Sequence, residues 1–454
     1  QIQGGSAVKG SDFENSRGVS EFYQLGDYYQ FPQGDIAVFG LWFGNFYIYF
    51  AGQKFLQSNL RNQSLWLRDP QKIFDYVSKH CNIIYTIMKT IFVTSFHPHI
   101  SRNILLSGAF ERLKNTPDLH VVVMVPRHKT EYFQKNFASP NVSIEGVELY
   151  QASRTRCGLF FKRLSRTFFD TGTTRGKRRY KYYWDKKFFY FWGSSFVSFF
   201  GRSFILQKIV RWLDFHLAPK GFFDALIEKY QPDLIFSTDI HNENDVAVMF
   251  DARQHGIKIL GMWRSWDNPT QQMLRIFPDK LFCGSEELRH ETIQLHNYPE
   301  GQIRMTGHPH YDRYLKGPTR SKEQFFADFK LDHKRPFILF APGGDKIIQY
   351  NDTDVYALEI LRELGHQVLV RYPPGEDIHL IDAKGWPNYV VFDKPGQRFS
   401  ARPKDLEIRR EDDDNLIDEL YYSSLVVTGP TSIPLDAALF DRPSIIADIY
   451  PTGR

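Results

Sequence analysis

The feature that most constrains this fold is a series of short apolar runs that alternate with helical segments along most of the chain. Runs of four to seven residues are typical of parallel strands that helices cover on both faces. The runs form two sets, which predicts an α/β protein with two doubly wound domains facing each other across a cleft. The first set comprises Lys89 to Thr94, His120 to Val125, Ser143 to Leu149, Asp233 to Ser237, Lys258 to Met262 and Lys280 to Cys283. The second set comprises Phe337 to Ala341, Gln367 to Arg371, Tyr389 to Phe392, Leu425 to Thr428 and Ser444 to Ala447.

The domain boundaries follow from the connection between the two sets. Residues 306–334 are rich in glycine, proline and charge, which predicts an N-terminal domain over 88–315 and a C-terminal domain over 316–454. Residues 1–87 show little helical or strand periodicity, so we expect an N-terminal extension of unknown role, and the sequence leaves open whether Met88 is the true start. The sequence does not begin with methionine and stops soon after an apolar run. We therefore expect missing sequence at one or both ends, including a truncated C-terminal domain.

Composition excludes several classes of protein. With 42% hydrophobic and 24% charged residues among 454, the chain can bury a sizeable core and is not a disordered tail. Three widely spaced cysteines make neither a disulfide framework nor a paired zinc motif, which favours a reducing, cytosolic compartment. The longest uncharged apolar stretch, Ile36 to Gly52, falls short of the roughly 20 residues that a membrane-spanning helix needs. We therefore expect no transmembrane helix.

The net charge of +5 hides one concentrated basic segment. Between Arg154 and Tyr190 twelve basic residues face only Asp170 and Asp185, and aromatic residues interleave with them through 154–205. This pattern fits peripheral attachment to an anionic membrane surface, or a helical insertion whose aromatics pack on the first domain. Nucleic-acid binding is a weaker third reading, because no recognised motif accompanies the patch. The basic residues are Arg154, Arg156, Lys162, Arg163, Arg166, Arg175, Lys177, Arg178, Arg179, Lys181, Lys186 and Lys187.

Polar residues follow several of the apolar runs, at the places where ligands bind in doubly wound sheets. Because parallel strands end at the same edge of a sheet, we expect these loops to converge on the cleft. The loops are Ser95-Phe96-His97-Pro98-His99, Thr238-Asp239-Ile240-His241, Trp263-Arg264-Ser265-Trp266-Asp267-Asn268 and Pro342-Gly343-Gly344-Asp345-Lys346.

The last of these loops has the composition of an anion site. Gly343 and Gly344 let the backbone approach a phosphate closely, and Lys346 adds a point charge. The spacing does not match the P-loop, which argues against an ATPase or GTPase. A tight turn with a solvated lysine is the competing interpretation.

The strongest local signal lies near the end of the chain. The run Leu425 to Thr428 leads through Gly-Pro to Thr431 and Ser432 at an expected helix start, with Pro434 in the first turn. Free N–H groups and hydroxyls at such a start bind phosphate oxygens, and Asp436 could accept hydrogen bonds from ribose hydroxyls. An ordinary N-cap on a crossover helix is the alternative.

Four segments, in this order and spacing, carry a resemblance to a known family. They look like the two-domain GT-B glycosyltransferases, with two Rossmann-like domains facing a cleft. Within that fold they are most similar to the branch of CDP-glycerol glycerophosphotransferases, capsule polysaccharide transferases and UDP-N-acetylglucosamine 2-epimerases. The likeness runs from about Met88 to the end. The segments are Ser265 to Asn268, Thr306-Gly307-His308-Pro309-His310-Tyr311-Asp312, Ile338 to Pro342, and Tyr422 to Thr428 followed by Thr431-Ser432-Ile433 and Asp436.

The resemblance implies a nucleotide-activated donor on the second domain and an acceptor on the first. Thr431 and Ser432 match the hydroxyl pair at the phosphate-binding helix start, and Asp436 matches the acidic position that contacts the ribose. Gly307 to Asp312 matches the segment that joins the domains. Arg371 matches the first residue of an Arg-x-His-Pro pattern, but this chain has proline where the histidine would stand, so only the arginine can pair with phosphate.

The resemblance also implies transfer without a metal or other cofactor. In this fold type the helix start and basic side chains neutralise the departing diphosphate. The acidic run Glu411 to Asp414 precedes an expected helix, where carboxylates favour the N-terminus electrostatically, so we do not interpret it as a metal site.

An inverting transfer needs a base that takes the proton of the acceptor hydroxyl, and histidine titrates in the right range. His97 and His99 lie in the first strand-to-helix loop, from which several GT-B enzymes present a base, and Asp239 lies on the same rim. We expect His99 or Asp239 to be the base. His241, Trp266 and Asp267 are candidates for contacts with the acceptor or the sugar, although a buried tryptophan beside a turn would explain Trp266 equally well.

These interpretations together predict an enzyme of surface-polysaccharide or cell-envelope glycan synthesis, cytoplasmic and peripheral at the inner face of the membrane. It would move a sugar or polyol phosphate from a UDP-, CDP- or CMP-linked donor to a glycan or lipid-linked acceptor. One alternative is a nucleotide-sugar 2-epimerase, and another is a non-catalytic scaffold that binds nucleotide sugars.

Overall fold

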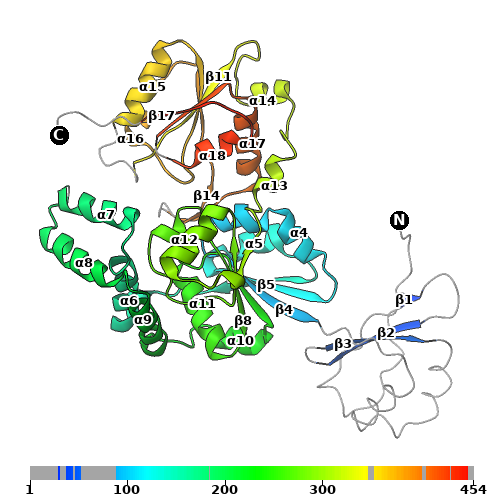
Figure 1. The fold of residues 1–454 in the computed structure, drawn as a ribbon. Helices are drawn as coiled ribbons and strands as arrows, with labels where there is room; N and C mark the ends of the chain where they lie inside the picture. The colour runs from blue at the N-terminus through cyan, green and yellow to red at the C-terminus, as the bar shows by residue number, and fades with distance from the viewer. Residues whose placement is uncertain are drawn as a thin grey trace, which may run out of the picture. The chain divides into compact units, whose positions relative to one another are not determined.

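The computed structural model describes residues 29–30, 37–43, 46–52, 88–183, 185–345, 352–400, 405–429 and 431–447 (Figure 1). The chain divides into two compact units, one formed by Gln1–Lys89 with Thr116–His120 and the other by Thr90–Asn115 with Val121–Arg454. No helix among the described residues is long and apolar enough to cross a membrane.

The first unit contains an antiparallel sheet of three strands, β1 (Tyr29–Gln30), β2 (Ala37–Phe43) and β3 (Phe46–Gly52). These three strands were not among the runs that the sequence analysis identified. Aromatic and β-branched residues have high strand propensity. They fill both alternating positions of β2 and β3, so the usual polar-apolar alternation is missing from the sequence.

The first parallel sheet has seven strands in the order β10-β9-β8-β7-β4-β5-β6, and every pair with a described register is parallel. All six predicted runs form strands, and only the short, largely exposed β10 was missed. The strands are β4 (Lys89–Thr94), β5 (Leu119–Pro126), β6 (Val142–Val147), β7 (Leu234–Ser237), β8 (Lys258–Met262), β9 (Lys280–Cys283) and β10 (Ile303–Met305).

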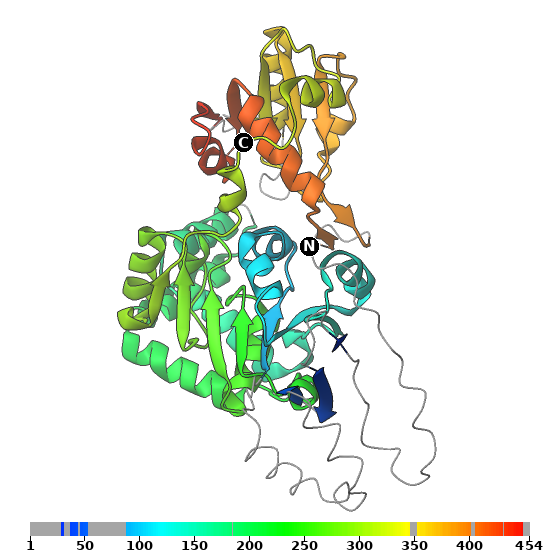
Figure 2. The same ribbon diagram turned by 90° about the vertical axis from the view of Figure 1, so that its right-hand side faces the viewer.

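The second parallel sheet has five strands in the order β13-β12-β11-β16-β17. The five predicted runs all form strands, and a two-stranded antiparallel pair, β14 with β15, was not predicted. In Figure 2 this pair lies beside the start of α17. The strands are β11 (Phe337–Ala341), β12 (Gln367–Arg371), β13 (Val390–Asp393), β14 (Gln397–Arg398), β15 (Leu406–Glu407), β16 (Leu425–Thr428) and β17 (Ser444–Ile446).

Alternate residues of the second sheet belong to different hydrophobic clusters. Phe337 and Leu339 of β11 pack in one cluster, whereas Ile338 and Phe340 pack in the other. Successive strand residues point to opposite faces, so the sheet is buried on both sides, as the continuous apolar runs predicted. The helices of this part are α13 (Tyr311–Tyr314), α14 (Lys322–Asp328), α15 (Thr353–Glu363), α16 (His379–Asp382), α17 (Arg410–Tyr422) and α18 (Ile433–Ala438).

Helices pack on the first sheet around one large core cluster. The most buried of them, α11, begins at Asn242, whose side chain accepts from the Asn244 amide, and residues 245–252 are all buried. The helices around this sheet are α3 (Pro98–Ile100), the π-helix η3 (Ser101–Leu105), α4 (Gly108–Lys114), the 3₁₀ turn η4 (Arg127–Lys129), α5 (Thr130–Phe137), α10 (Asp224–Tyr230), α11 (Glu243–Gln254) and α12 (Glu286–His296).

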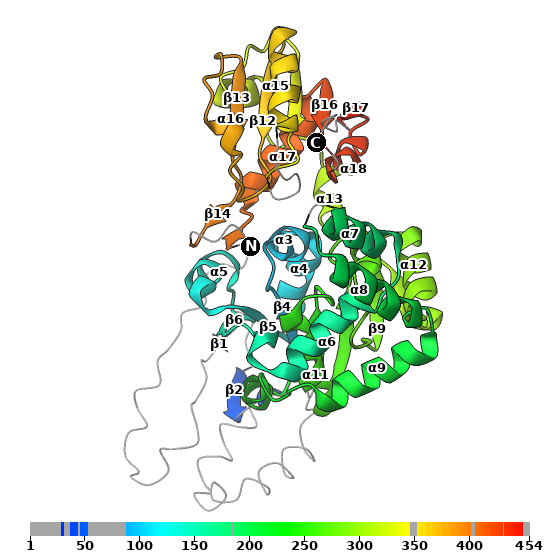
Figure 3. The same ribbon diagram turned by 90° about the vertical axis from the view of Figure 1, so that its left-hand side faces the viewer.

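The basic and aromatic segment folds into four helices between β6 and β7 (Figure 3). Thr155 and Ser203 cap the first and last of them by accepting backbone N–H groups. Val197, Leu206 and Val210 pack toward Phe168, Phe169 and Met273. The helices are α6 (Arg156–Thr167), α7 (Gly172–Tyr183), α8 (Phe188–Phe200) and α9 (Phe204–Leu217).

Each parallel sheet reverses its strand order at one point. In the first sheet the reversal lies between β4 and β7, and in the second it lies between β11 and β16. Ligands of doubly wound sheets bind at this switch point, beyond the carboxyl ends of the strands. The loops after these four strands are therefore the first places to look for a site.

Candidate functional site

Segments that follow five parallel strands, β4 and β8 of the first sheet and β11, β12 and β16 of the second, line one cavity of about 680 Å³. A smaller cavity of about 100 Å³ shares part of its lining. The larger volume lies in the range of small-molecule sites. Both parallel sheets thus contribute their strand ends to one space. The residues common to the two cavities are His99, Arg102, Ser265, Trp266, Ser432 and Asp436.

The segment after β4 presents two of these residues. His97 caps α3, because its Nδ1 accepts the His99 amide at 3.2 Å, and the π-helix η3 follows directly. Within η3 the side chains of Ile104 and Leu105 are buried, while Arg102 is partly exposed. π-Helical turns are rare and often occur at functional sites.

Arg102 makes no close ion pair among the described residues, although the carboxylates of Asp436 and Asp413 act on it at longer range. Within the described part of the chain its one hydrogen bond runs from Nε to the Asn103 Oδ1 at 3.4 Å. Burial lowers the pKa of Arg102, but Tyr314, Asp436 and Asp413 act in the opposite sense and leave it raised. The guanidinium is therefore charged, lines both cavities and is available to an anionic ligand.

His99 combines a free ring nitrogen with a low proton affinity. Its Nδ1 is buried and has no hydrogen-bond partner in the described part of the chain. Burial, together with the charges of Arg102 and Arg264, lowers the pKa of His99 to about 3. The imidazole is therefore neutral near pH 7 and can accept a proton.

His97 supports His99 rather than facing the cavities. The two rings stack with their centroids 5.0 Å apart, and the Nδ1 of His97 is occupied by the His99 amide. His97 lines neither cavity. The structure thus separates the two histidines that the sequence placed together as candidate bases, and leaves only His99 in contact with the space where a substrate could lie.

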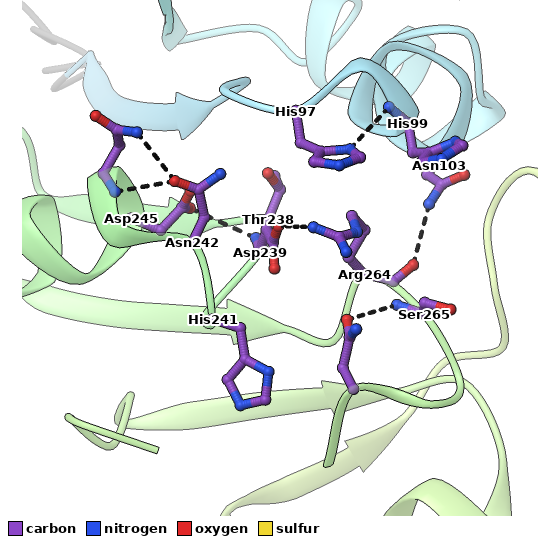
Figure 4. A network of polar contacts seen from close by, with 12 residues as sticks. His97, His99, Asn103, Thr238, Asp239, His241, Asn242, Asp245, Arg264 and Ser265 are labelled. Carbon is purple, nitrogen blue, oxygen red and sulfur yellow. Dashed lines mark hydrogen bonds and ion pairs between the residues drawn. The ribbon is translucent and has the colours of Figure 1, made fainter. Parts of the chain in front are cut away.

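Asp239 and His241, both predicted on the rim, also line neither cavity. Asp239 is 1% exposed and forms an ion pair with Arg264, which itself lines the smaller cavity (Figure 4). His241 lies against the edge of the buried Trp263, with ring centroids 4.8 Å apart. The expectation that Asp239 and His241 face a substrate is therefore corrected: Asp239 is held by Arg264, and the half-buried His241 packs against Trp263.

A second buried carboxylate, Asp245, was not singled out from the sequence. Its Oδ1 accepts from Thr94 Oγ1 at 2.5 Å and from Ser237 Oγ at 2.8 Å. Burial raises the pKa of Asp245 to about 8, and the neighbouring Asp239 raises it as well. In the sequence Asp245 is one of several acidic residues at a helix start, so nothing distinguished it from a residue that only favours the helix dipole.

The corner between β16 and α18 has the local structure that the sequence predicted. Ser432 precedes the helix, its side chain makes no capping bond, and it lines both cavities. The hydroxyls of Thr431 and Thr428 lie 2.8 Å apart. Asp436 is buried, and its Oδ1 has no hydrogen-bond partner among the described residues. Burial raises the pKa of Asp436, with Arg102 opposing this shift and Asp413 adding to it.

The glycine loop after β11 binds an anion that belongs to the chain itself. The amides of Gly343 and Gly344 each donate to the Asp354 carboxylate at 3.0 Å. Gly344 has φ of +83°, a conformation that favours glycine. Because Asp354 occupies both amides, they are not free for phosphate, which corrects the predicted binding mode. Lys346 lies outside the described residues.

Arg371 is likewise saturated by partners in its own domain. It pairs with Asp393 at 2.6 Å and with Glu419 at 3.0 Å, and it donates to the Asp412 carbonyl at 2.7 Å. Burial alone would lower the pKa of Arg371, but Glu419 and Asp393 raise it. Its charge is balanced inside the domain, so the expectation of a free phosphate-binding arginine at this position is corrected.

The connection between the two sheets supplies residues that the sequence analysis treated only as a linker. His308, His310 and Tyr311 line the smaller cavity. His310 is 5% exposed, and neither ring nitrogen has a hydrogen-bond partner in the described structure. Burial, together with the charge of Arg102, lowers the pKa of His310 to about 2. The repeated histidines of this segment were the available signal.

Trp266 and Asp267 lie where a sugar contact was predicted. Trp266 is 51% exposed and lines both cavities, so the alternative of a buried tryptophan beside a turn is excluded. Asp267 lines the larger cavity and accepts from Gln271 Nε2 at 2.5 Å. Among the described residues, no group of three or more His, Cys, Asp or Glu side chains could hold a metal ion.

The chain matches no family model and no curated protein sequence. Among solved structures it is similar to UDP-GlcNAc 2-epimerase from Neisseria meningitidis bound to UDP-GlcNAc, at 10% identity over 79% of this chain and 82% of that one, with a TM-score of 0.48. The Methanocaldococcus jannaschii UDP-GlcNAc 2-epimerase in complex with UDP-GlcNAc and UDP gives 13% identity, 79% and 83% coverage, and 0.44. The wall teichoic acid polymerase TagF gives 11%, 79% and 69%, and 0.38.

Proposed function

We propose that this protein transfers a sugar or a polyol phosphate from a nucleotide-activated donor to an acceptor hydroxyl, in the synthesis of a surface polysaccharide or another cell-envelope glycan. One observation carries the proposal. Arg102, which follows β4 and makes no ion pair among the described residues, and Ser432, which follows β16 and makes no capping bond, line the same two cavities, where strand ends of both sheets meet.

A nucleoside diphosphate fits the chemistry of this cavity. Arg102 offers a charged, planar donor fork to phosphate oxygens, and the Ser432 hydroxyl offers a further donor. Asp436 keeps one oxygen without a partner among the described residues, which supports a bond from a ribose hydroxyl. Trp266, half-exposed on the same wall, provides a face on which a sugar ring can stack.

His99 is the group that we assign as the base. Its free Nδ1 takes the proton of the acceptor hydroxyl while the acceptor oxygen bonds to the donor carbon or phosphorus. The bond to the nucleotide breaks in the same step, and its electron pair leaves with the nucleotide phosphate, whose charge Arg102 balances.

Donor binding would also strengthen this base. Arg102 and Arg264 both lower the pKa of His99 in the free protein. An anionic diphosphate between these cations and the imidazole opposes their effect, so the pKa of His99 rises toward the range in which a base works well near neutral pH.

A nucleotide-sugar 2-epimerase is the second candidate, since the carboxylates of Asp267, Asp413 and Asp436 all line the larger cavity. An epimerase converts the nucleotide sugar to an isomer without any acceptor. A transferase releases the free nucleotide only when an acceptor is present.

The test therefore has two stages. Thermal shift with CDP-, UDP-, GDP- and CMP-activated donors identifies the donor, because a ligand at 100 times its dissociation constant stabilises the protein by about 2.7 kcal/mol. The donor that stabilises is then incubated with and without glycan acceptors, and nucleotide and isomer are separated by chromatography.

Substitution of the base completes the experiment. We expect His99→Ala to lower turnover by about 10²- to 10⁴-fold while donor binding persists. The control is His290→Ala, an exposed histidine of α12 that lines neither cavity. If the isomer forms without any acceptor, the protein is an epimerase and the proposed transferase function is wrong. Stabilisation by a donor without any turnover would favour the scaffold, and no stabilisation by any donor would contradict the proposed function.

A further inference from the structure

Helix α8 turns its apolar side chains away from the protein. Phe189, Trp192, Phe196 and Phe199 are 96%, 67%, 68% and 65% exposed, and their spacing places them along one side of the helix. The side that faces the protein carries the buried serines instead, Ser194 and Ser198. This is the reverse of the usual pattern on a helix at the surface of a water-soluble domain.

Helix α9 repeats the reversal. Ile205, Ile209 and Trp212 are 73%, 46% and 59% exposed, whereas Gln207 and Asp214 are buried. Helix α6 contacts both α8 and α9, and α7 packs on α8, so the four helices form one continuous layer (Figure 3).

The buried polar side chains of α8 and α9 all have partners. The hydroxyls of Ser194 and Ser198 donate to carbonyls of their own helix. Gln207 donates to Gly201 and Leu295, and Asp214 binds Arg275 through two bonds of 2.7 and 2.8 Å. The reversed orientation is therefore a satisfied packing arrangement, and it leaves an extended apolar face in water, which marks an interaction surface.

The charges around this face are almost all positive. Helix α8 contains no charged residue, while Arg163, Arg175 and Arg179 on α6 and α7 are exposed. Of the three acidic residues in 154–217, Asp170 is bound by Arg175, Arg178 and Arg202, the exposed Asp185 pairs with Lys187, and Asp214 is buried. The apolar face is thus bordered by cations that have few internal partners.

The apolar face and its basic border together indicate which partner binds there: a second copy of the chain, a nucleic acid or a lipid bilayer. A second copy of the chain docked face to face would bring its cations against these, which is unfavourable. A nucleic acid needs phosphate contacts next to each stacked base, and the uncharged α8 offers none. An apolar helical face with a basic border matches the interface of a bilayer that carries anionic headgroups.

We propose that the exposed faces of α8 and α9 insert into the interfacial region of an anionic phospholipid bilayer, with the arginines of α6 and α7 on the headgroups. This docking deepens the proposed function and rests on it in one respect: it assigns the acceptor to the class of lipid-linked glycans, which the bilayer would bring to the cleft.

The test is sedimentation of the full chain with vesicles of phosphatidylcholine, with and without phosphatidylglycerol. We expect binding to the anionic vesicles and a marked loss of binding at high salt. The variant Phe189→Ser/Trp192→Ser/Phe196→Ser should lower the partition coefficient at least about tenfold, since it removes three exposed apolar side chains. Its matched control is Tyr356→Ser/Ile360→Ser/Leu364→Ser, which removes three side chains of similar exposure (59%, 53% and 61%) from the α15 region.

A second pair of variants separates charge from apolar contact. Arg163→Glu/Arg179→Glu should weaken anionic binding about tenfold or more, whereas Arg304→Glu/Lys316→Glu, exposed elsewhere, should not. Equal binding to neutral and anionic vesicles, or full binding by the triple serine variant, would overturn the proposal. So would a dimer, or RNA binding, that the triple serine variant abolishes.

Donor binding is measured on the same proteins. Wild type and triple serine variant should show the same thermal shift with the active donor, because none of the three positions lines the cavities. Vesicle binding without any donor shift would defeat the proposed function and leave the docking surface intact. A thermal shift with the donor but no vesicle binding would contradict the docking surface and leave the proposed function intact.

Discussion

The polar groups on the two walls of the cavity differ in whether they already have partners within the protein. On the wall that follows β4, which we call the free wall, Arg102 makes no close ion pair and the Nδ1 of His99 makes no hydrogen bond among the described residues. On the wall that follows β11 and β12, the Gly343 and Gly344 amides and Arg371 are all bound by carboxylates of their own domain.

This contrast teaches that position and availability are separate properties. All these residues follow a strand of a parallel sheet, which is the feature the sequence reveals. Whether a group is free depends on partners far away in sequence, such as Glu419, which lies 48 residues from Arg371. A saturated group stabilises the fold, whereas a free one can bind a ligand.

The largest expected effect is a loss of stability on the wall that follows β11 and β12, which we call the saturated wall. We expect Arg371→Gln to lower the free energy of unfolding by about 3–5 kcal/mol, because it leaves the buried Glu419 without its cation. Urea denaturation followed by circular dichroism measures this. The double variant Arg371→Gln/Glu419→Gln should recover much of the loss. Full stability in the single variant combined with lost donor binding would reverse the roles of the two walls.

On the free wall we expect a substitution to lower donor affinity and to leave stability almost unchanged. We expect Arg102→Gln to weaken binding of the nucleotide donor by roughly tenfold to hundredfold, the effect of losing a charged hydrogen bond of about 1.5–3 kcal/mol. Its free energy of unfolding should change by less than about 0.5 kcal/mol, since no ion pair is broken. Isothermal titration calorimetry and urea denaturation measure the two quantities.

The control for Arg102 is Arg304→Gln. Arg304 is exposed and donates only to the carbonyls of Gly301 and Ile303. Its substitution should leave donor affinity unchanged. If Arg102→Gln destabilises the fold as much as Arg371→Gln does, the distinction between a free and a saturated wall fails.

Two histidines sharpen the same distinction. Burial lowers the pKa of His99 and of His296 to about 3. Both nitrogens of His296 are bonded, to the Leu274 amide at 3.3 Å and to the Pro269 carbonyl at 2.9 Å. Titration by histidine-selective NMR should show that the donor raises the pKa of His99 by about one unit or more and leaves that of His296 unchanged. Equal shifts in both residues would indicate a global change instead.

The pH dependence of stability has a definite sign for His296. Its pKa is lower in the folded protein than in the unfolded chain, so acidification protonates the unfolded chain first. The stabilisation from His296 is complete above the unfolded pKa of about 6.5 and falls by up to about 1.4 kcal/mol for each pH unit below it. Denaturation between pH 7 and pH 5 measures this, and His296→Gln should flatten the slope. A slope that His296→Gln leaves unchanged would assign the acid sensitivity to other groups.

The sequence predicted the architecture better than the site. Both parallel sheets followed from apolar runs, since burial on two faces leaves a continuous hydrophobic pattern. The Ser432 corner and the His99 loop were also located, because a strand end followed by a helix start is visible locally. The partners of individual side chains could not be predicted. The bond from the Gly343 amide to Asp354 and the ion pair between Arg264 and Asp239 depend on contacts between separate segments. The same holds for His310, whose ring has no hydrogen-bond partner among the described residues.

The smallest expected effect concerns Trp266. We expect Trp266→Ala to raise the KM for the substrate whose sugar it contacts by about 2- to 12-fold, equivalent to about 0.5–1.5 kcal/mol of aromatic contact, with kcat little changed. Steady-state kinetics measure the two constants. Tyr356→Ala is the control, because Tyr356 is similarly exposed, at 59% against 51%, but lies on α15 outside both cavities. A fall in kcat with KM unchanged would mean that Trp266 acts only in the transition state, and the free wall would then extend from Arg102 and His99 to a third side chain.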